Sequence, residues 1–568
     1  METLGFFSSI QWLTRYEIVL CIIDLFLLVQ YTIPVLRRVK WISYVPVAGM
    51  IIAIFSFAYG DATLPALVLY ALTLFIFLCT IPKLLRPSLD KMVQRRLFWR
   101  IVLLIAGLLP ILFVFAVAGE LRYNPVTDSS QSSYKEAFLT MNQRLSTEYP
   151  FGEWKGVDWD QLKKTYEPRF AEADKNQDAV LYYKTLREYL YSFQDGHIKI
   201  VNEQLFDQNS IFKSEVGGGF GLSTVLLEDG RVLVSLVLKN SPAERKGIKV
   251  GTEIVKWNGL PAEQVYKSTT WSDNPPTTAD VKRENQGRFM VRAPIGKEIP
   301  VEFRNLGRST TQTTVFTAYD DHFETLKVSR IKLTPADLEK SPIESKILEN
   351  DYGYVRIKYF LSTTKPAKEL EEVLLNFQHH NVKGIILDLR NNPGGEDELA
   401  AEIAGSFIRE EKHYEYVSYY NRYTRSFKLN SLETLRVKPN KRGYTGPLAI
   451  LINSRTASSG EGLPLMLKDQ PNVVIVGFTG TNGSFGILSR PITFHMPEGY
   501  IVQFPDGRSL NKNKGIQLDS GVHGMGGVSP DIRIPLTEKT FTERYINMKD
   551  IEVQTAVAAL ESKAGSIP

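Results

Sequence analysis

The sequence contains almost no cysteine. Its 568 residues include only Cys21 and Cys79, and both lie in apolar runs near the N-terminus. The rest of the chain can therefore form no disulfide, and it shows no Cys/His spacing of the kind that binds structural zinc. We accordingly expect neither a disulfide framework nor a metal.

The chain also lacks a strong excess of charge of one sign. Its 67 Lys and Arg residues and 62 Asp and Glu residues give a net charge of +5, and much of the basic excess lies in short loops among the first 100 residues. This distribution argues against a nucleic-acid partner. A chain of this length, 43% hydrophobic, is too long for a single core, so two to four domains are expected.

Long apolar runs, in contrast, are abundant near the N-terminus. Residues 17–35, 42–59, 64–81 and 98–117 each approach the roughly 20 residues that cross a bilayer. They predict a membrane domain over residues 1–120 with four transmembrane helices. The links after the first and third runs are rich in Lys and Arg, which places these links in the cytoplasm and both chain ends outside. The prediction is an integral membrane protein whose N-terminus and large remaining part are extracytoplasmic.

Residues 133–209 have the periodicity of helices. The stretches "YKEAFLTMNQRL" and "AVLYYKTLREYLYSF" place apolar residues three and four positions apart. The segment ends in "SFQDGHIKIV", which predicts a turn at Asp195 and Gly196 that leads into a strand carrying His197. We therefore expect a helical subdomain here.

Residues 213–319 are rich in predicted strands. The stretch "GGGFGLSTVLLEDGRVLVSLVLKNSPAERKGIKVGTEIVKWNG" looks like the first half of a PDZ domain, a peptide-binding module, and an insertion follows at about residues 268–293. The resemblance implies that the next strand offers an edge to an added peptide strand. It also implies that backbone amides of the glycine loop hold a terminal carboxylate, and this loop comprises Gly219, Phe220, Gly221 and Leu222.

Residues 320–568 alternate between strand and helix patterns, which predicts an α/β core. "GIILDLRNNPGG" and "GPLAILIN" begin with near-continuous apolar strands of the kind that packs on both faces. The loops "NNPGG" and "SRTASSGEG" follow such strands, where open α/β sheets place their sites. Asp388 and Arg390 are expected to form a buried or half-buried pair that shapes the first loop. Ser458 lies in the second loop, just before a helix, but a serine hydroxyl needs a base and no neighbour in sequence provides one.

Five of these stretches occur together in a recognisable order. "YGYVRI", "GIILDLRNNPGG", "AILINSRTASSGEG", "VVIVG" and "GGVSPDI", after a PDZ-like segment, resemble the C-terminal processing (tail-specific) serine peptidases. The resemblance implies that Ser458 is the nucleophile, that the backbone N–H groups of Gly394, Gly395 and Ser459 hold the oxyanion, and that no cofactor or metal is needed. The usual lysine base of that family is replaced here by Gly483.

A second branch of this superfamily, the tricorn-like peptidases, uses histidine as the base. Its histidine follows a helical region upstream, and "SFQDGHIKI" is similar to that arrangement. His197 is therefore the candidate base, with a side chain whose pKa lies near working pH. The orienting acid of that branch would fall on Gly524, so Asp519 or Gln517 is left to orient the imidazole, and His523 has no clear role.

The predicted function is a membrane-anchored, extracytoplasmic serine endopeptidase. The family resemblance implies that it lies in a bacterial cell membrane. Its partners would be protein or peptide substrates with C-terminal tails or unstructured segments, and the PDZ-like segment would capture substrate or regulate cleavage. The alternative is a catalytically inactive, membrane-tethered scaffold of the same fold that only binds peptides. The two differ in whether Ser458 reacts with a serine-directed reagent.

Overall fold

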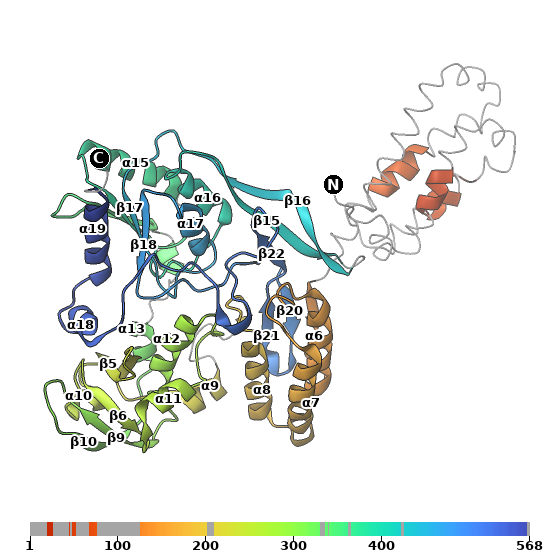
Figure 1. The fold of residues 1–568 in the computed structure, drawn as a ribbon. Helices are drawn as coiled ribbons and strands as arrows, with labels where there is room; N and C mark the ends of the chain where they lie inside the picture. The colour runs from red at the N-terminus through yellow and green to blue at the C-terminus, as the bar shows by residue number, and fades with distance from the viewer. Residues whose placement is uncertain are drawn as a thin grey trace, which may run out of the picture. The chain divides into compact units, whose positions relative to one another are not determined.

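The apolar strands predicted in the C-terminal half form one six-stranded sheet in the computed structural model (Figure 1). Its order is β12-β13-β14-β17-β18-β23, in which β12 is antiparallel to its neighbour and the other strands are parallel. The strands are β12 (Ile343–Ile347), β13 (Gly353–Ile357), β14 (Ile385–Asp388), β17 (Leu448–Leu451), β18 (Val473–Gly477) and β23 (Ile532–Arg533).

Helices cover both faces of this sheet, which is why its strands are apolar at consecutive positions. Ile385, Leu387 and Ile450 pack towards helices α15 (Pro366–His379), α16 (Asp397–Gly405) and α17 (Ser459–Leu467). Ile386 and Leu451 pack towards α19 (Ile551–Ala564) on the opposite face (Figure 1). The loops that follow β14 and β17 therefore emerge at one edge of a fully buried sheet. The predicted α/β core is thus present.

The structure describes residues 20–26, 45, 48–52, 68–76, 125–201, 209–329, 335–338, 340–361, 365–421 and 425–564. The chain divides into two units. One comprises Met1–Pro125 with Tyr420–Ser431, and the other comprises Val126–Tyr419 with Leu432–Pro568. The predicted α/β core, the helical segment and the PDZ-like segment all belong to the second unit.

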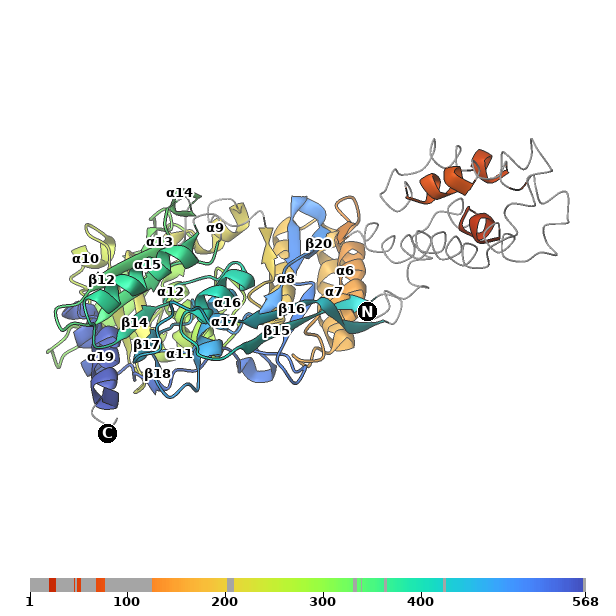
Figure 2. The ribbon, with the colours of Figure 1, turned by 90° about the horizontal axis from the view of Figure 1, so that it is seen from above.

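Three helices lie between residues 134 and 192: α6 (Tyr134–Glu148), α7 (Trp159–Asn176) and α8 (Ala179–Ser192). They pack against a small sheet of order β1-β20-β21-β2, as both ribbon views show (Figures 1 and 2). Its strands are β1 (Val126–Asp128), β20 (Ile492–His495), β21 (Ile501–Phe504) and β2 (Lys199–Ile200). The helices therefore share one core with residues about 300 positions further along the chain, and His197 directly precedes β2 in this core.

The β-rich segment forms a sheet of order β10-β9-β6-β5-β4. Its elements are β4 (Leu222–Leu226), β5 (Val232–Val237), α10 (Pro242–Arg245), β6 (Glu253–Trp257), β7 (Leu260–Pro261), α11 (Ala262–Ser268), α12 (Ala279–Phe289), β9 (Glu298–Arg304) and β10 (Gln312–Thr317). The same segment of the chain also forms a three-stranded sheet. Its strands are β3 (Gly218–Gly219), β8 (Arg292–Ala293) and β11 (Tyr319–Asp320), and β3 is the middle strand. Helix α12, from the predicted insertion, packs on β4, where the Thr224 hydroxyl donates to the Gly287 carbonyl at 2.8 Å.

The remaining elements connect these parts. A four-stranded sheet has the order β16-β15-β22-β19, with β15 (Lys412–Asn421), β16 (Ser426–Val437), β22 (Gly507–Leu510) and β19 (Gly486–Ile487). The other helices are α9 (Ser210–Val216), α13 (Glu324–Ser329), α14 (Pro335–Leu338) and α18 (Glu538–Phe541).

The predicted membrane domain is not supported. Helical residues in the first unit occur at 20–26, 45, 48–52 and 68–76, and none of the helices among these described residues has the length and apolar character of a bilayer span. The four predicted transmembrane helices, the integral membrane assignment and the extracytoplasmic location that followed from them are therefore corrected. Most of the four runs lies outside the described residues.

A glycine is required where α12 meets β4. A Cβ added at Gly287 would lie 2.2 Å from the Thr224 carbonyl oxygen. We expect Gly287→Ala to destabilise the protein by about 1–3 kcal/mol, because the helix must move off the strand. Alanine favours an isolated helix over glycine by about 1 kcal/mol, so a net loss identifies the contact. Urea unfolding measures the effect, with the exposed Lys282→Ala on the same helix as control. Equal unfolding midpoints for the two variants would contradict the close approach.

Candidate active site

Ser458 lies in the turn between β17 and α17, in a backbone conformation that is rare for a residue with a side chain. Its φ is 54° and its ψ is −133°. Such a conformation costs of order 1–3 kcal/mol and persists only where surrounding bonds hold it, often at functional sites. Here the Ser458 N–H donates to the Ser484 carbonyl at 2.9 Å and to Glu461 Oε2 at 3.2 Å. The hydroxyl is thereby presented at the N-terminus of a helix.

Glu461 holds this turn from within the first turn of α17. Its buried carboxyl group also accepts hydrogen bonds from the N–H groups of Gly483 at 2.7 Å and Ser484 at 2.9 Å, and from the Thr481 hydroxyl at 2.5 Å. Burial raises the pKa of Glu461 to about 8. The group is therefore mostly uncharged at neutral pH while it joins the Ser458 turn to the segment after β18.

The glycine loop after β14 packs directly against Ser458. Gly394 has a φ of 94°, and a Cβ there would lie 2.7 Å from the Ser458 Cβ and 2.8 Å from the Ser459 nitrogen. The Gly394 N–H itself donates to Asn392 Oδ1 at 2.8 Å. Within the described part of the chain, the N–H groups of Gly395 and Ser459 have no hydrogen-bond acceptor. These two amides are available to bind a negatively charged oxygen beside Ser458.

His197 reaches the same region from the helical segment. A Cβ at Gly196 would lie 2.3 Å from the Ser484 hydroxyl oxygen, and the Ser484 carbonyl accepts the Ser458 N–H. The His197 N–H donates to Asp195 Oδ1 at 2.9 Å, whereas its ring Nδ1 lies 3.8 Å from the same oxygen. Among the described residues, the Ser458 hydroxyl makes no hydrogen bond with the imidazole. The fold thus brings the two segments together without closing a Ser–His hydrogen bond.

Burial determines the charge of His197. The side chain is 9% exposed, and its Nδ1 has no hydrogen-bond partner in the described structure. Burial lowers the pKa of His197, an effect that Asp195 partly opposes and that Lys199 and Lys155 reinforce. The imidazole is therefore held in its neutral form, which is the form that accepts a proton.

Asp519 lies beside this histidine and is completely buried. Its Oδ2 accepts the Phe485 N–H at 3.1 Å, and its Oδ1 lies 2.8 Å from the Lys155 ammonium nitrogen. Burial raises the pKa of Asp519 to about 7, with Lys155 lowering it and Asp195 raising it further. Asp195 also accepts the Tyr149 hydroxyl at 2.7 Å. Carboxylate oxygens of Asp519 and Asp195 thus both lie within 4.8 Å of a ring nitrogen of His197. The sequence motif did not single out Asp195.

The chemistry of this cluster also bears on metal binding. One ligand atom each from Asp195, His197 and Asp519 lies within 4.8 Å of the others, a spacing that could accommodate a cation. The Lys155 ammonium already bonds to Asp519 at this point. The chain therefore supplies its own cation to the cluster.

The other predicted site residues lie elsewhere. The Gln517 side chain donates to the Tyr414 carbonyl and to the Ser509 hydroxyl, so its amide group is occupied away from His197. His523 is exposed and lines a cavity of about 310 Å³ together with Lys155 and Gln194.

The four residues predicted to bind a peptide terminus are also engaged. Gly219 pairs with Tyr319 on one side and Arg292 on the other, and a Cβ at Gly221 would meet the Ser241 side chain. Phe220 and Leu222 are buried in the core of the β-rich segment. In this conformation the glycine loop is therefore filled by the chain itself.

Comparison with known proteins identifies the α/β core. Residues 351–534 match the profile of Peptidase family S41. This segment is similar to the S41 peptidases, and we refer to residues 351–534 as the S41 domain. The prediction of a serine-type peptidase is thereby confirmed at the level of the family, and the tricorn-like branch and the PDZ-like character stay predictions.

Two curated relatives of the whole chain are carboxy-terminal processing proteases of Bacillus subtilis. The chain is 26% identical to CtpA over 324 residues, which cover 56% of this chain and 59% of that protein. It is 24% identical to CtpB over 367 residues, which cover 63% of this chain and 66% of that protein. These alignments span less than two thirds of either relative.

A solved structure shares the fold beyond the S41 domain. The crystal structure of mature CPAF aligns with a TM-score of 0.56 at 15% identity, covering 77% of this chain and 99% of that one. At this identity the likeness concerns the arrangement of the elements alone.

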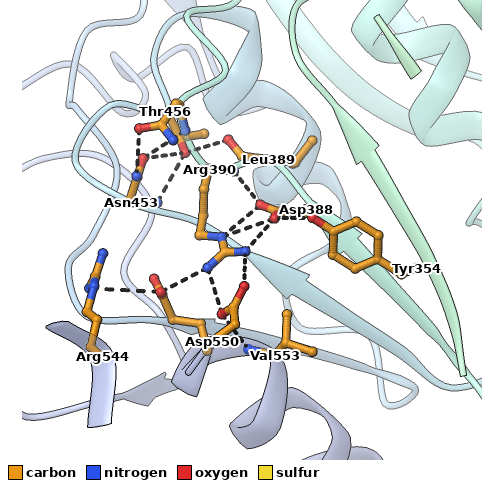
Figure 3. Close-up of polar contacts among 11 residues, drawn as sticks. Tyr354, Asp388, Leu389, Arg390, Asn453, Thr456, Arg544, Asp550 and Val553 are labelled. Atoms are coloured by element: carbon orange, nitrogen blue, oxygen red, sulfur yellow. Dashed lines mark hydrogen bonds and ion pairs between the residues drawn. The ribbon is translucent and has the colours of Figure 1, made fainter. Parts of the chain in front are cut away.

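Arg390 fixes the glycine loop of the S41 domain (Figure 3). Its guanidinium donates to Asp388 at the end of β14 and to Asp550 and Glu552 at the start of α19. Tyr354 donates to Asp388 at 2.7 Å. The predicted Asp388–Arg390 pair is therefore confirmed, and it also ties the loop to the C-terminal helix.

A second set of bonds joins this loop to the Ser458 turn (Figure 3). The Asn391 N–H donates to Asn453 Oδ1 at 3.0 Å, and the Thr456 hydroxyl donates to the Leu389 carbonyl at 2.8 Å. The Ala457 N–H donates to the Asn392 carbonyl at 2.9 Å. Movement of either loop would therefore move the other.

Sequence reasoning missed several residues of the site. Lys155 and Tyr149 lie in no motif and are more than 300 positions from Ser458, so no local signal identifies them. Asp195 stands two residues before His197, and an Asp-Gly-His order is the one signal that could have drawn attention to it. Glu461 was visible within "TASSGEG", but its bonds to Gly483 and Ser484 depend on the tertiary fold.

We expect Arg390→Met to destabilise the S41 domain by about 3–5 kcal/mol, because it leaves the buried Asp388 carboxylate without its cation and Glu552 with only the more distant Arg544. Thermal unfolding measures the loss. Arg533→Met is the matched control. Arg533 is largely exposed, and its ion pair with Asp280 should contribute only about 0–1 kcal/mol. Similar melting temperatures for the two variants would show that the Arg390 cluster does not hold the loop.

Proposed function

We propose that the chain is a serine endopeptidase that hydrolyses peptide bonds of protein substrates, with Ser458 as nucleophile and His197 as general base. The observation that carries this proposal is the strained Ser458 turn, together with the backbone N–H groups of Gly395 and Ser459, for which no acceptor occurs among the described residues. The buried, neutral imidazole packed behind Ser484 supplies the base that the family's missing lysine would otherwise provide.

In the proposed reaction the Ser458 oxygen attacks the carbonyl carbon of the peptide bond, and its proton passes to His197. The negative charge that develops on the carbonyl oxygen is bound by the N–H groups of Gly395 and Ser459, a contribution of about 3–4 kcal/mol for one such donor. His197 then gives the proton to the leaving amine, and it later activates the water that hydrolyses the acyl-enzyme. The Gly394 N–H is already bonded to Asn392, so it does not bind the oxyanion. Gly394 instead allows its loop to pack closely against Ser458.

The Ser458–His197 contact has to tighten for this reaction. Catalytic hydrogen bonds are often long in a substrate-free enzyme and form fully in the complex. Asp195 and Asp519 flank the imidazole and stabilise its protonated form when it arises. Asp519 is the orienting acid in this proposal, and Asp195 fixes the turn through the His197 N–H.

The substrates we propose are C-terminal tails or unstructured segments. The names of the relatives in Bacillus subtilis, carboxy-terminal processing proteases, are consistent with such substrates. The PDZ-like segment would capture or sense them. Its edge strand β4 is the surface to which an extended peptide would add.

Helix α12 would make that capture regulatory. It covers β4 through Gly287, and its other residues bond to the S41 domain. Glu284 accepts from the Ser454 hydroxyl and from Arg455, and Asp280 accepts the Gly480 N–H at 3.0 Å. A peptide that competes with α12 for β4 would therefore act on the segments that hold Ser458.

We expect Glu284→Gln to uncouple the two parts. Added peptide with a free C-terminus should stimulate cleavage of an unstructured substrate by the unmodified chain and not by the variant, since a neutral amide at this position binds Arg455 only weakly. Cleavage rates with and without peptide measure this, with the exposed Glu298→Gln as control. Equal stimulation in all three proteins would exclude α12 as the link.

The alternative is an inactive peptide-binding scaffold. The open Ser458–His197 contact is the observation in its favour. Chemistry at Ser458 separates the two functions.

We expect a serine-directed fluorophosphonate to label Ser458 in the unmodified chain and not in Ser458→Ala. His197→Ala should slow labelling and peptide hydrolysis by about 10²–10⁴-fold, the usual contribution of a general base. The exposed His379→Ala serves as control and should react normally. Absence of labelling in the unmodified chain, with and without added peptide, would favour the scaffold.

A further inference from the structure

A lysine from the helical segment is buried inside the proposed site. The Lys155 side chain is 4% exposed, and its ammonium nitrogen lies 2.8 Å from Asp519 Oδ1. It also donates to the Ser520 carbonyl at 2.5 Å, to the Ser520 hydroxyl at 3.0 Å and to the Gln194 carbonyl at 3.2 Å. A buried ammonium group is stable only when its N–H groups are paired in this way.

These bonds join two segments that carry proposed catalytic groups. Gln194 directly precedes Asp195 in the turn that presents His197, and Ser520 follows the proposed orienting acid, Asp519. Gln194 has a φ of 49°, and the Ser520 hydroxyl donates to its carbonyl at 2.8 Å. Lys155 therefore fixes the distance between the His197 turn and the Asp519 loop.

The charges around Asp519 give this lysine a second effect. The Asp195 carboxyl group faces the same region and disfavours a further negative charge on Asp519, as does burial. His197 is neutral there. Lys155 is the cation that bonds to Asp519, and it opposes the rise in the pKa of Asp519 that burial causes.

Lys155 is not arranged to act as the base itself. Its nitrogen lies within hydrogen-bond distance of four acceptors, and a base needs a lone pair directed at the hydroxyl of the nucleophile. A lysine base of the family would also come from the segment after β18, where this chain has Gly483. The role of Lys155 must therefore be exerted through its neighbours.

We propose that Lys155 is a positioning residue of the peptidase, whose ammonium group holds Asp519 as an ionised partner for His197 and locks the His197 turn in place. This inference rests on the proposed function. It assigns to the helical segment two contributions to the site, the base and the cation that controls the acid. An enzyme without the cation would keep its nucleophile and its oxyanion donors but would have a poorly oriented imidazole.

The test compares Lys155→Met and Lys155→Arg with the unmodified full chain. Cleavage of a fluorogenic unstructured peptide is measured from pH 5 to pH 9, with Lys135→Met as control for the loss of an ion pair in the same helical segment. We expect Lys155→Met to lower kcat by about 10- to 100-fold with little change in KM, less than the roughly 10⁴-fold cost of losing an orienting acid. Its acid limb should move to higher pH, because Asp519 loses the charge that favours its ionised form.

The arginine variant should restore the position of the acid limb and part of kcat, since it keeps the charge. Lys135→Met should resemble the unmodified chain. If Lys155→Met lowers the melting temperature but leaves kcat and the acid limb of the folded protein unchanged, the lysine is only structural and the proposal is wrong.

A measurement without catalysis separates this inference from the proposed function. A double-mutant cycle of Lys155→Met and Asp519→Asn, read as shifts in melting temperature, should show strong coupling at pH 8.5. The coupling should weaken at pH 5.5, because Asp519 is protonated below a pKa of about 7. Coupling that is absent at pH 8.5 would overturn the inference even if Ser458 reacts. If the coupling is present but Ser458 is not labelled, the ion pair exists and the proposed peptidase function is rejected.

Discussion

The reactive turn depends on one buried carboxyl group, that of Glu461. It accepts the N–H groups of Ser458, Gly483 and Ser484, so it joins the start of α17 to the segment that follows β18. A serine at φ 54° would relax to an ordinary helix N-terminus without such bonds. The raised pKa of Glu461 matters as much as its bonds. A fully ionised carboxylate at this place would repel the oxyanion that the Gly395 and Ser459 amides bind in the proposed reaction.

The sequence predicted those parts of the site that local pattern determines. Buried strands such as "IILD" and "LAIL" are apolar at every position because helices cover both faces of the sheet, and the loops after them had to meet at one edge. Ser458, Gly394 and Gly395 follow from this argument and from the family resemblance. Lys155 does not, because its only special property is a set of partners far along the chain. The membrane prediction rested on hydropathy alone, and none of the helices among the described residues is long and apolar enough to cross a bilayer.

The inserted segment is the least predictable element and has the widest contacts. Helix α12 lies on the edge of one sheet through Gly287 and reaches the loops of another through Asp280 and Glu284. The contacts at Gly287 and Asp280 involve backbone atoms and the contact at Glu284 is an ion pair with Arg455, so none of them leaves a periodic pattern in the sequence. A helix held at both ends in this way transmits displacement between two sheets that otherwise have separate cores.

The same insertion explains why this chain has no lysine where the family resemblance expects one. Position 483 has a φ of 78°, and a Cβ there would lie 2.8 Å from the Thr278 side chain and 3.4 Å from that of Ser520. Thr278 is the residue that caps α12, so the helix occupies the space through which a side chain at position 483 would leave the backbone. A side chain at position 483 would therefore have to displace Thr278 at the start of α12. In the proposed mechanism the proton acceptor comes instead from the His197 turn, which packs against Ser484 through Gly196.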